Sequence, residues 1–196
     1  MGVLRRLVPA AALPGFHAPG AGFEAPFEML AACHERVERM LALLTRLQQH
    51  LLESGCDDPA RQAASDVTRY FDLAAPLHHQ DEELHVFPPL LAGPDAGLRS
   101  LVQRLLDDHR AMEVAWPAAR RILVAVAGCP ATGWTPLLPK QTAALQAFAA
   151  LYQRHLADED GLAYPAAQEV LSAQALQAMG RDMMQRRGAP PFAAPD

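Results

Sequence analysis

The sequence predicts an all-α fold, namely an antiparallel up-down four-helix bundle followed by a short C-terminal helix. Apolar residues recur every three to four positions over long segments, which is the period of an amphipathic helix. No stretch alternates between apolar and polar residues as a half-buried strand would. The glycine- and proline-rich connections are short, so we expect successive helices to run antiparallel.

Start and stop signals delimit each predicted helix in turn. The first is entered at Pro26 and ends at the stretch SGCDDP. The second begins behind Asp58, with Pro59 in its first turn, where the missing N–H has no helical partner to lose. The stretches AGPDAG and GCPATGWTP delimit the next two helices, and Ser172 is a suitable cap for the last. The predicted helices are residues 25–53, 59–91, 98–127, 136–163 and 172–188.

Length and composition are those of a single globular domain. We expect an N-terminal arm at 1–22, the domain at 23–188 and a flexible tail at 189–196. The net charge is −5 and Lys140 is the single lysine, so no basic face for nucleic acid is evident. No apolar run reaches the ~18 residues of a membrane span. Three cysteines in no metal-binding pattern indicate reduced thiols and a cytoplasmic location, and no signal identifies a protein partner.

A repeated motif carries most of the titratable chemistry. The stretches HHQDEELHVFP (78–88) and HLADEDGLAYP (155–165) both read His, three residues, Glu, four residues, then an aromatic residue and proline. His78 and Glu82 therefore match His155 and Glu159 at an offset of 77 residues. Upstream of these motifs, the lone His34 and His109 precede them by 44 and 46 residues. The chain thus repeats a helix pair with one lone histidine and one His-x-x-x-Glu.

The spacing predicts that these side chains meet inside the bundle. Residues four apart on a helix differ by about 40° in direction, so His78 and Glu82 share a face, as do His155 and Glu159. With antiparallel helices, the rise per residue places all six near one level of the bundle. Buried ionised groups are unfavourable without partners, and a pair of metal ions would provide them. Nitrogen and oxygen donors without thiolate suit iron, manganese or zinc, and the donor set alone does not choose among them.

Other polar residues near the motifs have less specific interpretations. On an ideal helix His79 lies about 100° off the ligand face, so we expect it to orient a neighbour or to lie at a helix contact. His85 could support the site or pack in the core, and His17 and His50 are expected at the surface. Glu83 and Asp160 lie about 140° from the motif histidines, and the acids of HQDEE that do not face inward are interpreted as a solvated face.

The complete set of motifs resembles the hemerythrin-like HHE cation-binding domains. Its spacing is similar to that of the di-iron domain of bacterial iron–sulfur cluster repair proteins, and the resemblance covers about residues 23–188. It implies a four-helix bundle with a non-haem centre of two iron ions, although zinc or manganese would also suit the donors. The implied ligands are His34 and His78 on one iron, His109 and His155 on the other, and Glu82 and Glu159 as bridges.

One departure from the family pattern concerns the third helix. Oxygen-carrying hemerythrins have a fifth histidine there, where this chain has Glu113, four residues after His109. We expect Glu113 to face the interior, either as an iron ligand or in a local ion pair. The resemblance implies a protein that senses or handles oxygen, nitric oxide or iron. The alternatives are a repair factor or enzyme that reduces peroxide or nitric oxide, and a structural or regulatory bundle that metal only holds together.

Overall fold

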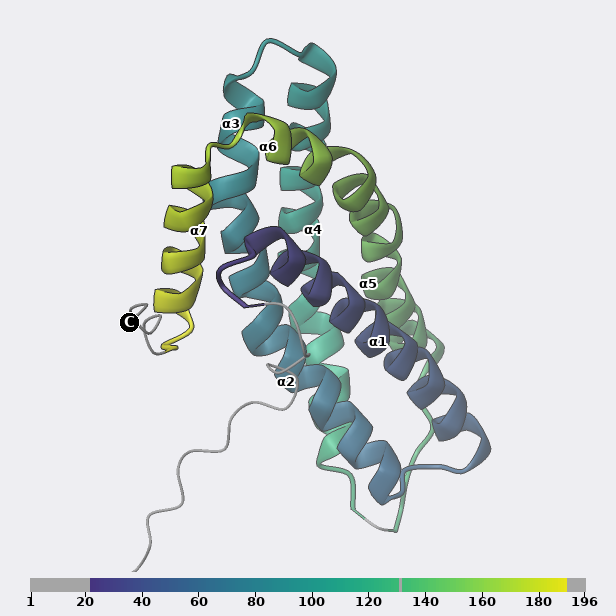
Figure 1. Cartoon of the computed structure of the whole chain (residues 1–196). Coiled ribbons are helices and arrows are strands. Elements are labelled where there is room, and N and C mark those ends of the chain that lie inside the picture. Colours follow the sequence, from purple (N-terminus) through teal and green to yellow (C-terminus); the bar gives the residue numbers. More distant parts are fainter. Residues whose placement is uncertain (1–21, 131, 190–196) are drawn as a thin grey trace, which may run out of the picture.

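The computed structural model describes residues 22–130 and 132–189, and within them the regular structure is entirely helical, which confirms the predicted all-α class (Figure 1). The expected N-terminal arm and C-terminal tail lie almost wholly outside the described residues. The elements in chain order are α1 (Pro26–Glu53), α2 (Asp58–Asp81), η1 (Glu82–Val86), α3 (Phe87–Ala92), α4 (Ala96–Ala127), α5 (Pro139–Asp158), η2 (Glu159–Ala163), α6 (Tyr164–Val170) and α7 (Ala173–Arg186).

Two of the long helical segments each contain a π-helical turn. In the first, η1 joins α2 to α3, and in the second, η2 joins α5 to α6. The second of these segments continues to Val170, beyond its predicted end near residue 163, because Pro165 lies in the first turn of α6, where proline is tolerated. Neither π-helical turn was predicted from the sequence.

Side-chain caps begin three of the helices. The Asp57 carboxylate accepts from the N–H of Ala60 at 3.0 Å and starts α2. Asp95 accepts from two backbone N–H groups at the start of α4. Ser172 accepts from the N–H of Ala175 at 3.2 Å and starts α7, which confirms the cap expected there.

The four long segments enclose the core. Helix α2 packs against α1 and α4, and α5 packs against α4 and, less extensively, α1. Two apolar clusters form the interior. One includes Val37, Phe71 and Phe148, and the other includes Leu30 and Leu105. His34 lies between Leu30 and Val37 on α1, so the buried histidines occupy a polar level between the two clusters.

Helix α7 lies outside the four segments and contacts α1 and α2 (Figure 1). Met179 and Met183 insert into the apolar cluster that contains Leu30. Gly180 lies so close to the chain before α1 that a Cβ atom there would be 2.0 Å from the carbonyl oxygen of Phe23. Only glycine therefore allows α7 to lie this close.

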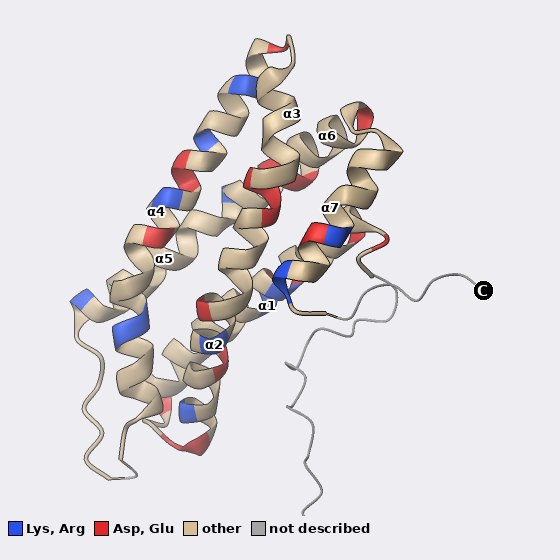
Figure 2. Ribbon diagram, turned by 90° about the vertical axis from the view of Figure 1, so that its left-hand side faces the viewer, with Lys and Arg blue, Asp and Glu red and all other residues tan. Residues whose placement is uncertain are grey.

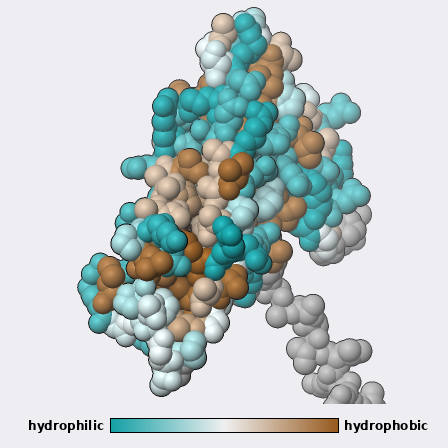
Figure 3. All heavy atoms as spheres, turned by 180° about the vertical axis from the view of Figure 1, so that it is seen from behind, coloured by the Kyte–Doolittle hydropathy of each residue, from teal (hydrophilic) through white to brown (hydrophobic). Residues whose placement is uncertain are grey.

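The surface is mixed in charge and polarity. Figure 2 shows basic and acidic residues interspersed along α4 and an acidic band where α2 passes into α3. Seen from behind, apolar side chains are more frequent in the lower half of the molecule (Figure 3). Among the described helices, none combines the length and apolar character needed to cross a membrane.

Candidate metal centre

The structure brings together all six residues that the repeat singled out. They come from all four long helical segments, and each is at most 2% exposed. Four of them, in the segments built on α1, α2 and α5, each place a donor atom within 4.8 Å of the others'. The six are His34 on α1, His78 on α2, Glu82 in η1, His109 on α4, His155 on α5 and Glu159 in η2.

The centre has two halves, one with His34 and His78 and the other with His109 and His155, and each glutamate faces both of them. Glu82 presents Oε1 to His78 Nε2 at 3.4 Å and Oε2 to His109 Nε2 at 3.5 Å. Glu159 presents Oε2 to His34 Nε2 at 3.2 Å and Oε1 to His155 Nε2 at 3.0 Å. One oxygen of each carboxylate is thus directed to each pair of histidines, which is the arrangement of a bridging carboxylate.

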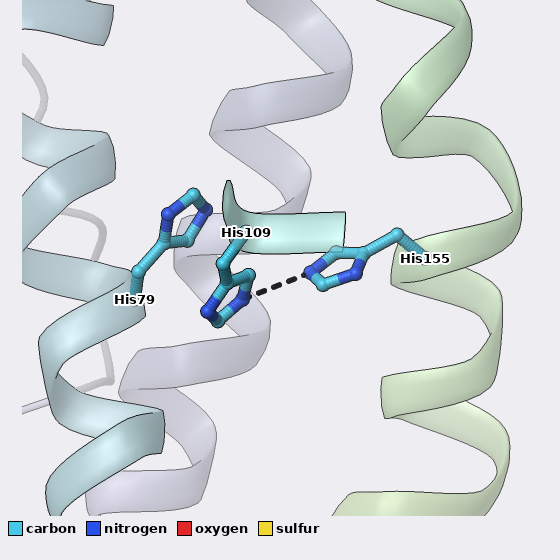
Figure 4. A group of neighbouring side chains, drawn as sticks. All are labelled: His79, His109 and His155. Carbon is cyan, nitrogen blue, oxygen red and sulfur yellow. Dashed lines mark hydrogen bonds between the residues drawn. The ribbon is translucent and has the colours of Figure 1, made fainter. Parts of the chain in front are cut away.

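The two histidine pairs have the same ring spacing, although their ring planes cross at 83° and 57°. The ring centroids of His34 and His78 are 4.8 Å apart, and those of His109 and His155 are also 4.8 Å apart. The Nε2 atoms of His109 and His155 approach to 3.2 Å (Figure 4). The sequence repeat is therefore expressed as an approximate twofold relation between the two halves of the site.

Outer carboxylates orient two of the histidines. The Nδ1 atom of His109 lies 2.8 Å from Glu83, and that of His34 lies 2.8 Å from Asp160. A carboxylate on Nδ1 fixes the ring and directs Nε2 toward the interior, as is common for metal-binding histidines. Both acids are exposed, so Glu83 lies on the solvated face as expected, but its carboxylate also contacts His109 on α4.

His79 lies closer to the donor atoms than the sequence predicts. It is 8% exposed and its ring stacks on His109 at 3.9 Å, which is the neighbour contact that was expected. One of its nitrogens also lies within 4.8 Å of nitrogens of His109 and His155, so these three could hold one metal ion (Figure 4). Adjacent His78 and His79 differ by about 100° in direction, and they reach opposite halves of the centre.

Glu113 does not face the bundle interior as expected. Its side chain is exposed and belongs to neither group of potential metal ligands. Met112, three residues after His109, takes the buried position instead. Positions three and four residues along a helix lie on either side of the starting direction, and in α4 the buried face follows the three-residue step.

The remaining acid of the first motif is also buried, contrary to its interpretation as part of a solvated face. Asp81 is 0% exposed and forms ion pairs with Arg186 and Arg187 near the end of α7, each at 2.5 Å. His85, expected either to support the site or to pack in the core, instead contacts Asp182 of α7 at 2.7 Å. The expected surface position of His50 fits its partial exposure, and His17 lies outside the described residues.

In the metal-free chain the centre divides into charged and neutral groups. Burial opposes the charged form of His34, but neighbouring carboxylates outweigh it and raise its pKa to about 12. They likewise raise the pKa of His109 to about 10 despite its burial. Burial opposes ionisation of the glutamates, yet the histidines hold the pKa of Glu159 at about 2 and that of Glu82 well below its usual range. Burial lowers the pKa of His78, so its ring is neutral.

The donors fit metal ions better than they fit one another. Both oxygens of Glu159, Oε2 of Glu82 and both ring nitrogens of His78 are buried without a hydrogen-bond partner. Buried polar atoms are normally paired, and leaving one unpaired costs about 1–3 kcal/mol. Cations among these atoms would satisfy them, and a nitrogen and oxygen donor set without thiolate suits iron, manganese or zinc.

Comparisons with known proteins agree with this geometry. The family model described as "Hemerythrin HHE cation binding domain" matches residues 25–167, which include all six donors. The chain is also 32% identical over 173 residues to a protein of Haemophilus influenzae that is described as uncharacterized. That alignment covers 85% of this chain and 92% of the relative.

Proposed function

Because the chain belongs to the hemerythrin HHE cation-binding domain family, we propose that its buried donors hold two iron ions. His34 and His78 bind one ion, and His109 and His155 bind the other. Glu82 and Glu159 bridge them. The observation that carries this proposal is the division of each carboxylate between the two histidine pairs, with its two oxygens directed to opposite halves of the site.

The function we propose is the binding and handling of a small oxygen or nitrogen species, such as oxygen or nitric oxide. A bound iron pair supplies Lewis acidity and electrons to such a molecule. The protein orients the histidines through Glu83 and Asp160 and excludes bulk water by burying the donors. Peroxide or nitric oxide reduction, as in a repair-type factor, is the enzymatic version of the same function.

The size of the adjoining cavity supports a small ligand. A partly open pocket of about 60 Å³ is lined by His79, the exposed Glu113 and apolar side chains of α2, α4 and α5. Because one water needs about 10–15 Å³ of such space, the pocket has room for a small molecule such as oxygen or nitric oxide. Its contact with His79 favours access from the half of the centre that contains His109 and His155.

We also propose the helix topology around the site and the location of the protein. We place it in an antiparallel up-down four-helix bundle, since successive long segments that contact each other are joined by short connections. We propose a cytoplasmic location, which is supported by the free thiols of Cys33, Cys56 and Cys129. We propose no nucleic-acid or membrane partner.

The test is the response of the iron-loaded protein to small molecules. Diferrous protein is exposed without air to nitric oxide, and separately to oxygen or peroxide, while its absorption spectrum is followed. We expect the spectral change to be complete when no more than one ligand molecule has been added per iron pair. Repeated consumption of the ligand would indicate an enzyme. Zinc-loaded protein is the redox-inert control. If protein with two bound irons responded to none of these molecules, the metal would only hold the helices together.

A further inference from the structure

The two halves of the centre differ at one aromatic position of the repeat. Phe87 and Tyr164 occupy equivalent places, each five residues after a bridging glutamate, and both are buried. The Phe87 ring lies 5.6 Å from the ring of His109, and the Tyr164 ring lies 5.1 Å from that of His34. The pair therefore follows the approximate twofold relation, and the chemical difference between its members is the hydroxyl group of Tyr164.

That hydroxyl lies among the donor atoms of one half of the centre. It donates a hydrogen bond to Glu82 Oε1 and lies 2.9 Å from Nε2 of His34. Because Asp160 engages the other nitrogen of His34, Nε2 is the atom directed at the metal position. An oxygen this close to both a carboxylate oxygen and an imidazole nitrogen lies at the distance that separates neighbouring ligands of one ion.

We propose that Tyr164 provides a phenolic oxygen ligand to the iron held by His34 and His78. This inference rests on the proposed di-iron function and adds a donor of a different chemical class to one half of the site. Phe87 cannot do the same for the iron held by His109 and His155.

A second difference between the two motifs affects the half of the centre that contains His109 and His155. His79 corresponds to Leu156 in the second motif, and it adds a nitrogen near His109 and His155. The two irons are therefore chemically unequal, one with a phenolic oxygen and the other with an additional imidazole nearby. The small pocket adjoins the imidazole-rich half at His79, whereas the Tyr164 ring packs edge-on against Phe27.

Substitution of Tyr164 by phenylalanine removes one oxygen atom and keeps the ring, so it tests the ligand without opening a cavity. Tyr152 is the matched control, because it is equally buried but packs against Phe71 and Phe148 instead of the donors. Both variants and the wild type are loaded with ferric iron. Iron content, visible absorption and resonance Raman spectra are then compared, with circular dichroism to verify folding.

We expect the wild type to show a visible phenolate-to-iron charge-transfer band with enhanced tyrosine ring vibrations. Tyr164→Phe should keep two irons and lose both signals, whereas Tyr152→Phe should keep them. Wild-type protein with two irons but no such band, or a band unchanged in Tyr164→Phe, would overturn the assignment of Tyr164 and leave the di-iron proposal intact. Wild-type protein that binds fewer than two irons would overturn both.

Discussion

Asp81 is the buried link between the metal-binding segment and α7, and its removal should be strongly destabilising. Its carboxylate is fully buried and pairs with Arg186 and Arg187, whose side chains are 17% and 5% exposed. Asp81→Ala removes the carboxylate that pairs with Arg187 and leaves Arg186 with Asp182 alone, and breaking a buried pair typically costs about 3–5 kcal/mol. At roughly 2–4 °C per kcal/mol for a domain of this size, the melting temperature should fall by roughly 6–20 °C.

The assay is thermal and urea unfolding of metal-free protein, so that release of metal does not contribute. Asp66→Ala is the matched control, because Asp66 pairs with Arg69 at 2.9 Å on the exposed surface of α2. Such exposed pairs contribute about 0–1 kcal/mol, so the control should be nearly neutral. If Asp81→Ala and Asp66→Ala lost the same small amount of stability, the ion pairs to α7 would not hold the structure as described.

Three further predictions follow from the same contacts. Chelation of the metal should lower the melting temperature at neutral pH, because the buried oxygens of Glu159 and the ring nitrogens of His78 then lose their partners; equal melting temperatures with verified metal loss would contradict this. The pKa values of about 12 for His34 and about 10 for His109 mean that both are protonated in metal-free protein at pH 7.5. Metal binding should therefore release protons and weaken as the pH falls, and calorimetry in buffers of different ionisation enthalpy would detect the protons or refute their release. Gly180→Ala should destabilise the fold by about 1–3 kcal/mol through its clash with a backbone carbonyl, and unchanged urea unfolding would show that α7 can shift without loss.

The donor set could be predicted from the sequence because its information is local. A His-x-x-x-Glu motif fixes two side chains on one face of a helix whatever the tertiary structure, and the motif occurs twice. The lone histidines followed from the repeat of that motif with its preceding helix. Four long helical segments were equally evident, since their apolar period and their breakers are properties of short stretches of sequence.

What the sequence did not reveal depends on contacts between distant segments. The burial of Asp81 requires two arginines more than 100 residues away, and nothing in the motif itself indicates them. The exposure of Glu113 depends on which of two nearly equivalent helix directions faces the core. The π-helical turns were also missed, and their residues Glu83 and Asp160 contact His109 and His34 on other helices, which angles within one helix cannot predict.

The most direct test of the central claim is the number of iron ions bound by each folded chain after reconstitution and removal of excess metal. The account predicts two per chain in the wild type and in His50→Ala, whose histidine lies away from the centre. It predicts a loss of bound iron in His78→Ala and His155→Ala. A folded wild-type protein that never exceeded one tightly bound iron, or a centre emptied by His50→Ala and unaffected by His78→Ala, would contradict it.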